Sequence, residues 1–407
     1  MSFWAPESLR SAAGGTWLAR PGRGPGPAHG LSTDTRTLAP GQAFLALRGE
    51  HFDGHAFLRA AVAAGAATLI IDRPALADGV PAPPGGVIAV PDTGRALLRL
   101  ASAYRDQLER ATVIGVAGSN GKTTTARLIQ AVLATTFRGT APAKSFNNAV
   151  GVPLTVLSAD PDDEYLVCEI GTNHPGEIAE LAGVVRPDIA VITSIGREHL
   201  EGLGSLAGVA REEADLLTYI RPGGVAVATA DAPELAPYLR CLPEVITFGA
   251  SAGAHLRLAG AAHELAPDGL VRLRLRVSDG RAPGGAEAAY LTPLLGAHNA
   301  LNVLAALAVA RRLGVPEAAI AAALAGARPA PMRLEPQTAG GIALLNDAYN
   351  ANPESMAAAL RTLAELVPPG GRRVAVLGDM LELGPEEERF HREIGAHARA
   401  RGVDVLV

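Results

Sequence analysis

The stretch Gly115–Thr123 constrains the fold of this chain more than any other part of its sequence. It reads G-V-A-G-S-N-G-K-T, which resembles the phosphate-loop pattern G-x-x-x-x-G-K-[ST] with one residue more between its first glycine and Gly121, and it lies between a strand-like apolar run and a helix-like segment. The glycines of such a loop let backbone N–H groups turn around phosphates, and the helix N-terminus adds its dipole. We therefore expect a phosphate-binding loop in a parallel sheet, with Lys122 at the β- and γ-phosphates and the Thr123 hydroxyl on Mg²⁺.

The pattern around this loop is that of a mostly parallel α/β sheet. Four apolar, strand-like runs follow one another with helix-like segments between them, at 113–117, 165–170, 188–194 and 225–229. A mixed region precedes them, and a proline-rich hinge at 328–331 separates them from a third region. The third region has predicted strands at 342–346 and 373–377 and helices at 353–366 and 385–400. The sequence therefore predicts an α/β protein of three domains, at 1–110, 111–327 and 328–407.

The third region ends on another strand-like run, Val403–Val407, with no helix after it to cover it. Three strands and two helices are too few for a self-sufficient doubly wound domain. We therefore expect the Rossmann-like C-terminal domain to be incomplete in this sequence.

Charge and composition exclude several classes of function. Lys and Arg number 36 and Asp and Glu number 41, and the resulting net charge of −5 argues against a nucleic-acid binder, which would carry a basic excess. We see no run of about 18–20 apolar residues that would span a membrane, and no signal peptide. The 2 cysteines can build neither a disulfide framework nor a four-ligand zinc site. We expect a cytoplasmic monomer that binds no nucleic acid and does not insert into membranes.

Lysine is rare in this chain, because all basic residues except Lys122 and Lys144 are arginine. Arginine replaces lysine where a positive charge is enough, but not where a compact ammonium group is needed. Lys122 has such a role in the phosphate loop. The retention of Lys144 indicates a contact with a phosphate or carboxylate of a substrate.

The loop in its longer form, Ala117–Thr125, resembles the G-[ST]-N-G-K-T-[TS] loop of the Mur ligase family, ATP-dependent enzymes that build the peptide stem of bacterial cell-wall precursors. Six further motifs resemble the same family: Phe146–Pro153, Glu169–Ile178, His199–Ser205, Gly296–Asn302, Asn346–Pro353 and Gly378–Gly384. The elements N-H-P-G-E-I, H-L-E-G-x-G-S and D-x-Y-N-A-N-P favour the member that adds D-alanyl-D-alanine to UDP-N-acetylmuramoyl-tripeptide. The resemblance implies a three-domain ligase that uses ATP and Mg²⁺ and forms an amide through an acyl phosphate.

The resemblance implies an ATP site made by the loop and by two later parts of the chain. Its residues would be Gly118, Ser119, Asn120, Gly121, Lys122, Thr123, Thr124, Asn299, Asn302, Arg333 and Asp347. Asn299 and Asn302 would face the adenine, although Asn299 is also placed to be a helix N-cap. Arg333 and Asp347 would approach the γ-phosphate and the ribose.

The resemblance also implies two Mg²⁺ ions and the catalytic residues Lys122, Glu169, His199 and Glu213. Thr123 and Glu169 would hold the first ion, since a glutamate at the end of an apolar strand is costly unless paired or metal-bound. His199 would hold the second. The family's carbamylated lysine falls on Glu213 here, which keeps the negative charge with a shorter reach. A buried salt bridge for Glu169 and a solvated acidic face for the helix of Glu213 stay open.

Substrate contacts are implied in all three predicted domains. They are Asp34 and Arg36 for the UDP end, Lys144, Asn147 and Asn148 in the central domain, and Tyr349, Asn350 and Asn352 for the dipeptide. An ordinary turn pair at Asp34 and Arg36 and a plain loop at 349–352 are the alternatives. Two other functions also stay open: a sibling ligase that adds a single amino acid, and a non-catalytic relative that binds nucleotide or precursor.

Overall fold

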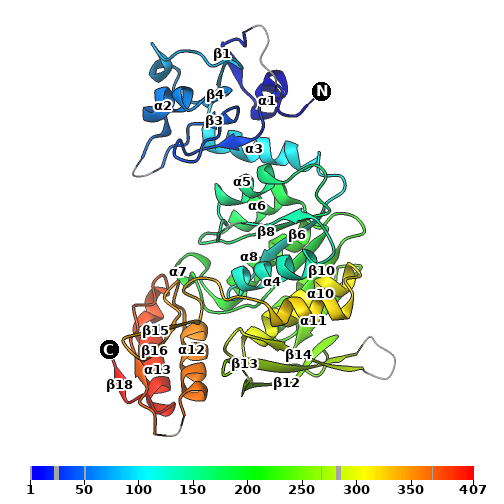
Figure 1. The fold of residues 1–407 in the computed structure, drawn as a ribbon, viewed down its shortest axis with the longest axis vertical. Helices are drawn as coiled ribbons and strands as arrows, with labels where there is room; N and C mark the ends of the chain where they lie inside the picture. The colour runs from blue at the N-terminus through cyan, green and yellow to red at the C-terminus, as the bar shows by residue number, and fades with distance from the viewer. Residues whose placement is uncertain are drawn as a thin grey trace.

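The computed structural model describes residues 2–22, 27–49, 52–142, 144–266, 268–280, 286–368 and 370–407. It has an N-terminal region (α1 to α3), a central region (β6 to α11) and a C-terminal region (β15 to β18). The N-terminal region lies at one end of the long axis, and the C-terminal region lies beside the strands β12 to β14 at the other end (Figure 1).

The N-terminal region is a small sheet with helices. Its helices are α1 (Pro6–Ala13), α2 (Leu58–Ala63) and α3 (Thr93–Arg105), and its strands are β1 (Thr16–Ala19), β2 (Leu31–Ser32), β3 (Ala43–Leu45), β4 (Thr68–Ile71) and β5 (Val87–Ala89). The strand order is β1-β5-β4-β3-β2, with only β1 antiparallel to its neighbour.

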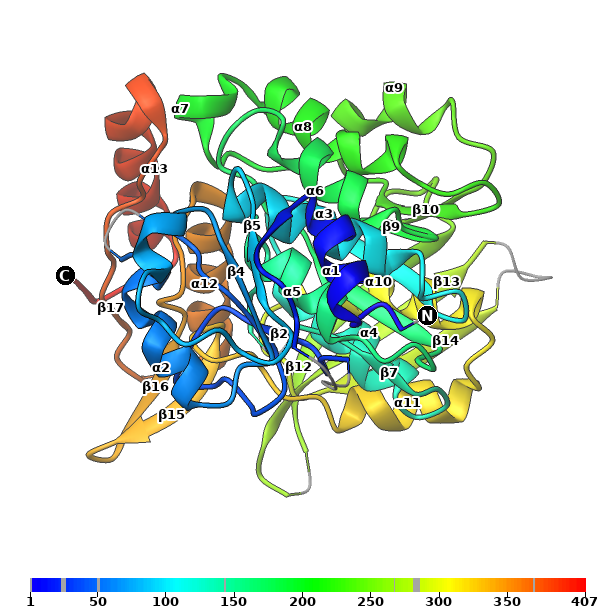
Figure 2. The ribbon, with the colours of Figure 1, turned by 90° about the horizontal axis from the view of Figure 1, so that it is seen from above.

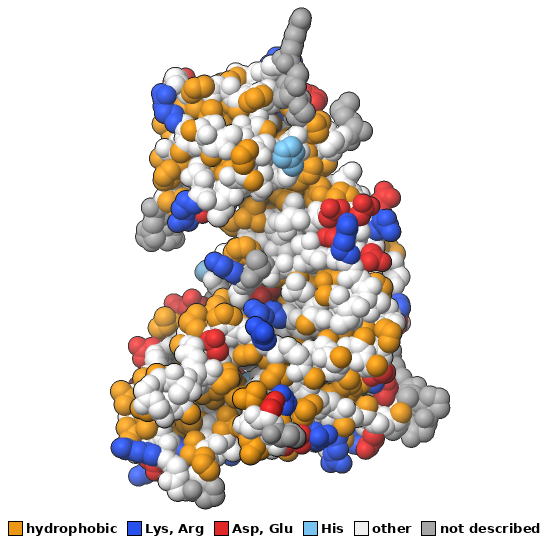
Figure 3. Space-filling view, in the orientation of Figure 1, with side chains coloured by type: hydrophobic (Ala, Val, Ile, Leu, Met, Phe, Trp, Pro, Cys, Tyr) orange, Lys and Arg blue, Asp and Glu red, His pale blue; other side chains and the backbone are white. Residues whose placement is uncertain are grey.

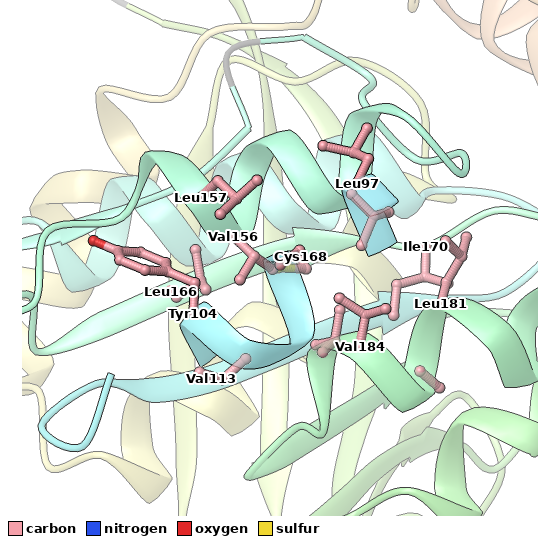
Figure 4. Packing of buried hydrophobic residues seen from close by; sticks show 14 of the residues in the cluster. Leu97, Tyr104, Val113, Val156, Leu157, Leu166, Cys168, Ile170, Leu181 and Val184 are labelled. Atoms are coloured by element: carbon pink, nitrogen blue, oxygen red, sulfur yellow. The ribbon is translucent and has the colours of Figure 1, made fainter. Parts of the chain in front are cut away.

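Helix α3 fastens the N-terminal region to the central one. It begins at the cap Asp92, whose carboxylate accepts the Arg95 N–H at 2.7 Å. Its buried face meets α5 and α6 in one continuous apolar core (Figure 4). At the end of the helix the Tyr104 hydroxyl donates to the carbonyl of Ala159 at 2.7 Å, and Arg105 donates to that of Val185 at 2.8 Å. The N-terminal region is therefore not a loosely tethered module.

The central region is built on a sheet in the order β14-β13-β12-β11-β10-β9-β6-β8-β7. Its strands are β6 (Thr112–Ala117), β7 (Gly139–Thr140), β8 (Tyr165–Glu169), β9 (Ile189–Ile192), β10 (Val225–Thr229), β11 (Val245–Gly249), β12 (Leu256–Leu265), β13 (Val271–Asp279) and β14 (Glu287–Thr292). The strands from β7 through β11 to β12 run parallel, and β12, β13 and β14 are antiparallel. The βα pattern predicted from the sequence is confirmed.

Helices cover both faces of the parallel strands, which explains why those strands are apolar throughout. The helices are α4 (Lys122–Leu133), α5 (Gly151–Ser158), α6 (Glu177–Val185), α7 (Leu200–Leu203), α8 (Leu206–Thr218), α9 (Ala236–Leu239), α10 (Asn299–Arg312) and α11 (Glu317–Ala325). One core lies under α4, α10 and α11, and another under α5, α6 and α8. The carboxyl ends of β6, β8 and β9 therefore meet at one edge, where ligands of such sheets bind.

The C-terminal region has two helices and two short sheets. They are β15 (Glu335–Ala339), β16 (Ile342–Asn346), α12 (Pro353–Leu366), β17 (Val374–Ala375), α13 (Glu387–Ala400) and β18 (Val405–Leu406). The strand at 342–346 and the helix at 353–366 agree with the prediction. The hairpin strand β15 was not expected, because E-P-Q-T-A is polar, contains a proline and is largely exposed.

The C-terminal region is packed against the central region next to α7. Both ribbon views place α7 beside the part that carries α13, and the backbone N–H of Glu201 donates to the carbonyl of Glu382 at 3.0 Å (Figures 1 and 2). A hollow separates the N-terminal from the C-terminal region on one side of the molecule (Figure 3). None of the described helices is long and apolar enough to cross a membrane.

Candidate active site

The phosphate loop lies between β6 and α4, as the sequence predicts, and two of its glycines cannot be replaced without strain. Gly118 and Gly121 have φ angles of 118° and 86°, a region that side chains other than glycine rarely adopt. A Cβ on Gly118 would lie 2.4 Å from Oγ1 of Thr193, and one on Gly121 would lie 2.1 Å from Oδ1 of Asn302. Both positions are therefore fixed by close packing as well as by conformation.

A cavity of about 310 Å³ opens at the loop and collects most of the predicted site residues. Those that line it are Ser119, Asn120, Gly121, Lys122, Asn147, Asn148, Glu169, His199, Arg333, Asp347, Tyr349, Asn350 and Asn352. A second cavity of about 410 Å³ shares Glu169, Arg333 and Tyr349 with the first and is also lined by Thr123 and Lys144. Residues far apart in the chain thus converge on one edge of the central sheet.

Lys122 is held inside the loop by oxygen atoms. Its Nζ donates to the carbonyl of Gly118 at 2.6 Å and to that of Ser119 at 3.2 Å, and lies 3.6 Å from Oε1 of Glu198. Burial by itself lowers the pKa of Lys122, but the neighbouring carboxylates, of which Glu198 acts most strongly, outweigh it and raise that pKa. Lys122 is therefore a fixed positive charge in the cavity.

Glu169 closes β8 and is 1% exposed. Its Oε1 accepts the Thr123 hydroxyl at 3.0 Å and the Asn147 amide at 3.1 Å. Its Oε2 is buried with no hydrogen-bond partner within the described residues. Burial raises the pKa of Glu169, and Lys122 opposes that shift. Glu169 belongs to no salt bridge among the described residues. The alternative interpretation of Glu169, as one partner of a buried salt bridge, is therefore not supported.

Glu198 is a site residue that the sequence interpretation missed. It is 5% exposed, and its Oε1, which faces Lys122, has no hydrogen-bond partner in the part of the chain that the structure describes. Its Oε2 lies 4.0 Å from Nε2 of His199. The sequence did contain a signal for this residue, because Glu198 is an acidic residue that lies directly before His199 and just past the end of an apolar strand.

Two buried carboxylate oxygens without a hydrogen bond, Oε2 of Glu169 and Oε1 of Glu198, are the kind of ligand that a divalent cation prefers. No three His, Cys, Asp or Glu side chains of the described residues form a ready metal site. Mg²⁺ is typically held by one or two carboxylates together with substrate phosphates and water. The donor set therefore fits a cation that binds together with a nucleotide.

Glu213 lies beneath the loop and does not line either cavity. It is fully buried, and its Oε2 accepts the N–H of Gly118 at 2.6 Å. Burial raises the pKa of Glu213 to about 8. Its neighbour Glu212 is also buried and accepts the N–H groups of Gly176 and Ile178 at the start of α6. The solvated acidic face is therefore wrong for both glutamates, while the role of Glu213 as a metal ligand stays a prediction.

Asn299 and Asn302 lie behind the loop in a hydrogen-bonded chain. The Asn299 amide donates to the carbonyl of Leu295 at 2.6 Å, and the Asn302 amide donates to Oδ1 of Asn299 at 2.8 Å. Asn299 is the first residue of α10, whose cap position is His298 without a side-chain cap bond. The N-cap interpretation of Asn299 is therefore wrong, because its side chain bonds backward and to Asn302. A contact of either residue with adenine stays a prediction.

The C-terminal region brings two predicted residues, Arg333 and Asn352, into contact with the loop. Arg333 donates to the Thr123 hydroxyl at 3.1 Å, and its guanidinium lies 4.1 Å from the ring centre of Tyr349. The Asn352 amide donates to Oδ1 of Asn120 at 2.8 Å. Asp347 accepts the N–H of Leu334 at 2.9 Å, and burial raises its pKa.

The remaining predicted residues make local contacts or lie apart from this site. Asp34 and Arg36 form an exposed pair in the N-terminal region at 2.6 Å, and Arg36 lowers the pKa of Asp34 to about 2. Asn148 accepts N–H groups at the start of α5, and Lys144 is exposed at the second cavity. Thr124 lines a third cavity, behind α4. The geometry alone assigns no ligand to these residues.

Comparisons with known proteins agree with this architecture. Three family models match, described as Mur ligase family, catalytic domain (27–105), Mur ligase middle domain (116–310) and Mur ligase, glutamate ligase domain (332–407). The UDP-N-acetylmuramoyl-tripeptide–D-alanyl-D-alanine ligase of Bacillus subtilis is 40% identical over 90% of this chain and 77% of its own length. The Escherichia coli ligase of the same name is 38% identical over 92% of this chain and 79% of its own length.

Solved structures extend the agreement to the fold. MurF from Acinetobacter baumannii superposes with a TM-score of 0.84 at 30% identity, covering 99% of this chain and 85% of that one. MurF from Thermotoga maritima, solved in complex with ADP, gives 0.79 at 25% identity, covering 93% of this chain and 83% of that one. The loop, the sheet, the three-region architecture and these similarities together show that the chain belongs to the Mur ligase family.

Proposed function

We propose that this protein is the ATP-dependent ligase that joins D-alanyl-D-alanine to UDP-N-acetylmuramoyl-tripeptide in peptidoglycan precursor synthesis. The similar ligases of that name support the choice of substrates. The observation that carries the proposal is one cavity lined by Lys122 and Glu169 from the central region and by Arg333, Asp347 and Asn352 from the C-terminal region. A ligase of this type must bring a triphosphate, a carboxylate and an amine together at such a junction.

The reaction needs positive charge, because both the tripeptide carboxylate and ATP are anions. An oxygen of the carboxylate attacks the γ-phosphorus, ADP leaves, and an acyl phosphate is formed. The amine of the dipeptide then attacks the acyl carbon, loses a proton and expels inorganic phosphate. Lys122 and Arg333, which both line the cavity, would balance the charge that develops on the phosphate oxygens.

Thr123 and Glu169 would hold one Mg²⁺ next to the phosphates, and His199 with Glu198 would hold a second. The buried oxygens of Glu169 and Glu198 that have no hydrogen bond among the described residues support this assignment. Mg²⁺ would supply charge neutralisation that no arrangement of these residues supplies alone. Glu213 accepts the Gly118 N–H from beneath the loop, and burial raises its pKa to about 8, so it would contribute negative charge at longer range only when bound cations favour its ionised form.

The remaining assignments follow the three predicted domains, 1–110, 111–327 and 328–407. Asp34 and Arg36 would bind the UDP end, and Lys144, Asn147 and Asn148 would bind the peptide or its carboxylate. Tyr349, Asn350 and Asn352 would bind the dipeptide, and Asn299 and Asn302 the adenine. We further infer a cytoplasmic monomer, which is consistent with small-molecule substrates that are made inside the cell.

The test is product formation by the purified chain. Incubation with ATP, Mg²⁺, the UDP-linked tripeptide and D-alanyl-D-alanine is expected to release phosphate and to raise the precursor mass by one dipeptide minus one water. Omission of either the tripeptide or the dipeptide is expected to abolish phosphate release. A preference for a single amino acid would identify a sibling ligase instead. Nucleotide binding without turnover on any acceptor would identify a non-catalytic relative.

A further inference from the structure

His199 contacts a side chain that comes from another region of the protein. Its Nδ1 is hydrogen-bonded to the carboxylate of Glu382, which lies 183 residues further along the chain and belongs to the loop before α13. The same loop makes a second contact, since the carbonyl of Glu382 accepts the N–H of Glu201 at 3.0 Å. Two successive points of contact therefore fix this loop against the segment that carries His199.

Both partners of this contact are held in unusual backbone conformations. The φ angles of His199 and Glu382 are 51° and 61°, in the left-handed region that residues other than glycine seldom adopt. Met380 and Leu383 beside Glu382 are buried in the core of the C-terminal region, which anchors the loop. The surrounding structure thus determines where the Glu382 carboxylate lies, although that side chain is half exposed.

The contact determines how the His199 ring is oriented. A carboxylate at Nδ1 accepts a hydrogen bond from the Nδ1–H group, so the neutral ring keeps its lone pair on Nε2. Nε2 lies 4.0 Å from the Glu198 carboxylate, whose other oxygen faces Lys122 of the phosphate loop. The lone pair is therefore turned toward the cavity, the arrangement by which an outer carboxylate orients a metal-binding histidine.

We propose that Glu382 is a positioning residue for His199, and that through it the docking of the C-terminal region prepares the cation site beside the phosphate loop. The inference rests on the proposed function only in taking a nucleotide-bound cation as the ligand of His199. Glu382 itself does not line either cavity at the phosphate loop. Loss of its carboxylate frees the His199 ring to rotate and to take the other tautomer.

The test measures cation binding and ring tautomer rather than turnover. Binding of Mn²⁺ to the protein saturated with ADP is followed by electron paramagnetic resonance for the wild type, Glu382→Ala and Glu382→Gln. Glu382→Ala is expected to weaken Mn²⁺ binding about tenfold, the lower end of outer-carboxylate effects. Glu382→Gln keeps a hydrogen-bond acceptor without the negative charge, so its loss of Mn²⁺ affinity is expected to be smaller than that of Glu382→Ala. Nitrogen-15 NMR of His199 is expected to show the Nδ1–H tautomer in the wild type and a mixture in Glu382→Ala.

Two comparisons separate positioning from a general effect on docking. Glu354 contacts Arg197 at 2.8 Å in the same interface without touching His199, so Glu354→Gln is expected to weaken Mn²⁺ binding less than threefold. In the His199→Ala background, Glu382→Ala is expected to cause no further loss. An equal loss in Glu354→Gln, an additive loss in the double variant, or an unchanged tautomer would each overturn the proposal. Absence of ligase product with the expected Mn²⁺ results would refute the proposed function alone.

Discussion

The ammonium group of Lys122 lies 3.6 Å from Oε1 of Glu198, an oxygen that has no hydrogen-bond partner among the described residues. Two backbone carbonyls of the loop hold the same ammonium at 2.6 and 3.2 Å. A single compact cation thus sits between the loop and a buried carboxylate. Phosphate oxygens entering the loop would compete for this cation, and a divalent cation could then take over the carboxylate.

Replacing Lys122 by arginine is expected to lower kcat about 10²- to 10³-fold, as for the loss of one well-placed electrostatic donor. The planar guanidinium is larger than the ammonium and cannot occupy the same point between Gly118, Ser119 and Glu198. Phosphate release under saturating substrates is the measurement.

The matched control is the same substitution at the other lysine. Lys144 is exposed at the second cavity, so Lys144→Arg is expected to keep kcat within about threefold, because a charge there needs no compact shape. Lys144→Ala is expected to raise KM for one substrate. Equal effects of arginine at the two positions would contradict this account of why each lysine is retained.

Activity is expected to be independent of bicarbonate. The resemblance to the family implies a carbamylated lysine at the position of Glu213, and the chain has no lysine besides Lys122 and Lys144 that could be modified in its place. Initial rates in buffer depleted of carbon dioxide should equal those after bicarbonate is added back. Activation by bicarbonate would show that a carbamate on Lys122 or Lys144 takes part in the reaction. That result would contradict the assignment of Glu213 in place of the carbamylated lysine.

The sequence was most informative where one short segment carries its own physical signal. The phosphate loop, the apolar strands β6, β8 and β10 and the capped helix α12 were all predicted close to their observed bounds. Strand β15 was missed because its pairing with β16 has no apolar alternation to reveal it. Local patterns could therefore define elements but not every pairing.

Contacts between distant segments could not be predicted in the same way. Glu198 was missed because its burial depends on the loop that faces it, and Glu382 because it reaches His199 from another region. These two are tertiary effects, which no spacing rule encodes. Asn299 is a different case, because its hydrogen bonds to Leu295 and Asn302 are local, and the helix begins one residue earlier than the cap interpretation requires.

The buried Glu213 is expected to make stability depend on pH. Burial raises its pKa to about 8 in the folded protein, from an ordinary value of about 4.3 in the unfolded chain. Its contribution to stability is therefore complete below about pH 4.3 and is lost as the pH rises toward about 8. Glu213→Gln keeps an acceptor for the Gly118 N–H and cannot ionise.

Urea unfolding of the wild type and Glu213→Gln, without nucleotide or metal, is the measurement. The stability of the variant relative to the wild type is expected to rise between about pH 5 and pH 8 and to level off above. A difference that does not change with pH would mean that Glu213 is ionised in the folded protein.

Substitutions of Asn352 are expected to show that the stability of α12 and the alignment of the active site depend on different hydrogen bonds of this residue. Its Oδ1 caps α12 by accepting the Ser355 N–H at 2.8 Å, while its amide donates to Asn120 in the phosphate loop at 2.8 Å. Asn352→Ser keeps a capping oxygen but cannot reach Asn120, so its free energy of unfolding should stay within about 0.5 kcal/mol of the wild type while kcat falls roughly tenfold.

Asn352→Ala removes both interactions and is the comparison that tests this separation. It is expected to lose about 1 kcal/mol of stability through the missing cap and to show the same loss of kcat as Asn352→Ser. Urea unfolding and initial rates of phosphate release, measured on the same preparations, give the two quantities. If Asn352→Ser were as active as the wild type, the amide contact with Asn120 would serve only to hold the two regions together, since the loop would then be aligned for reaction without it.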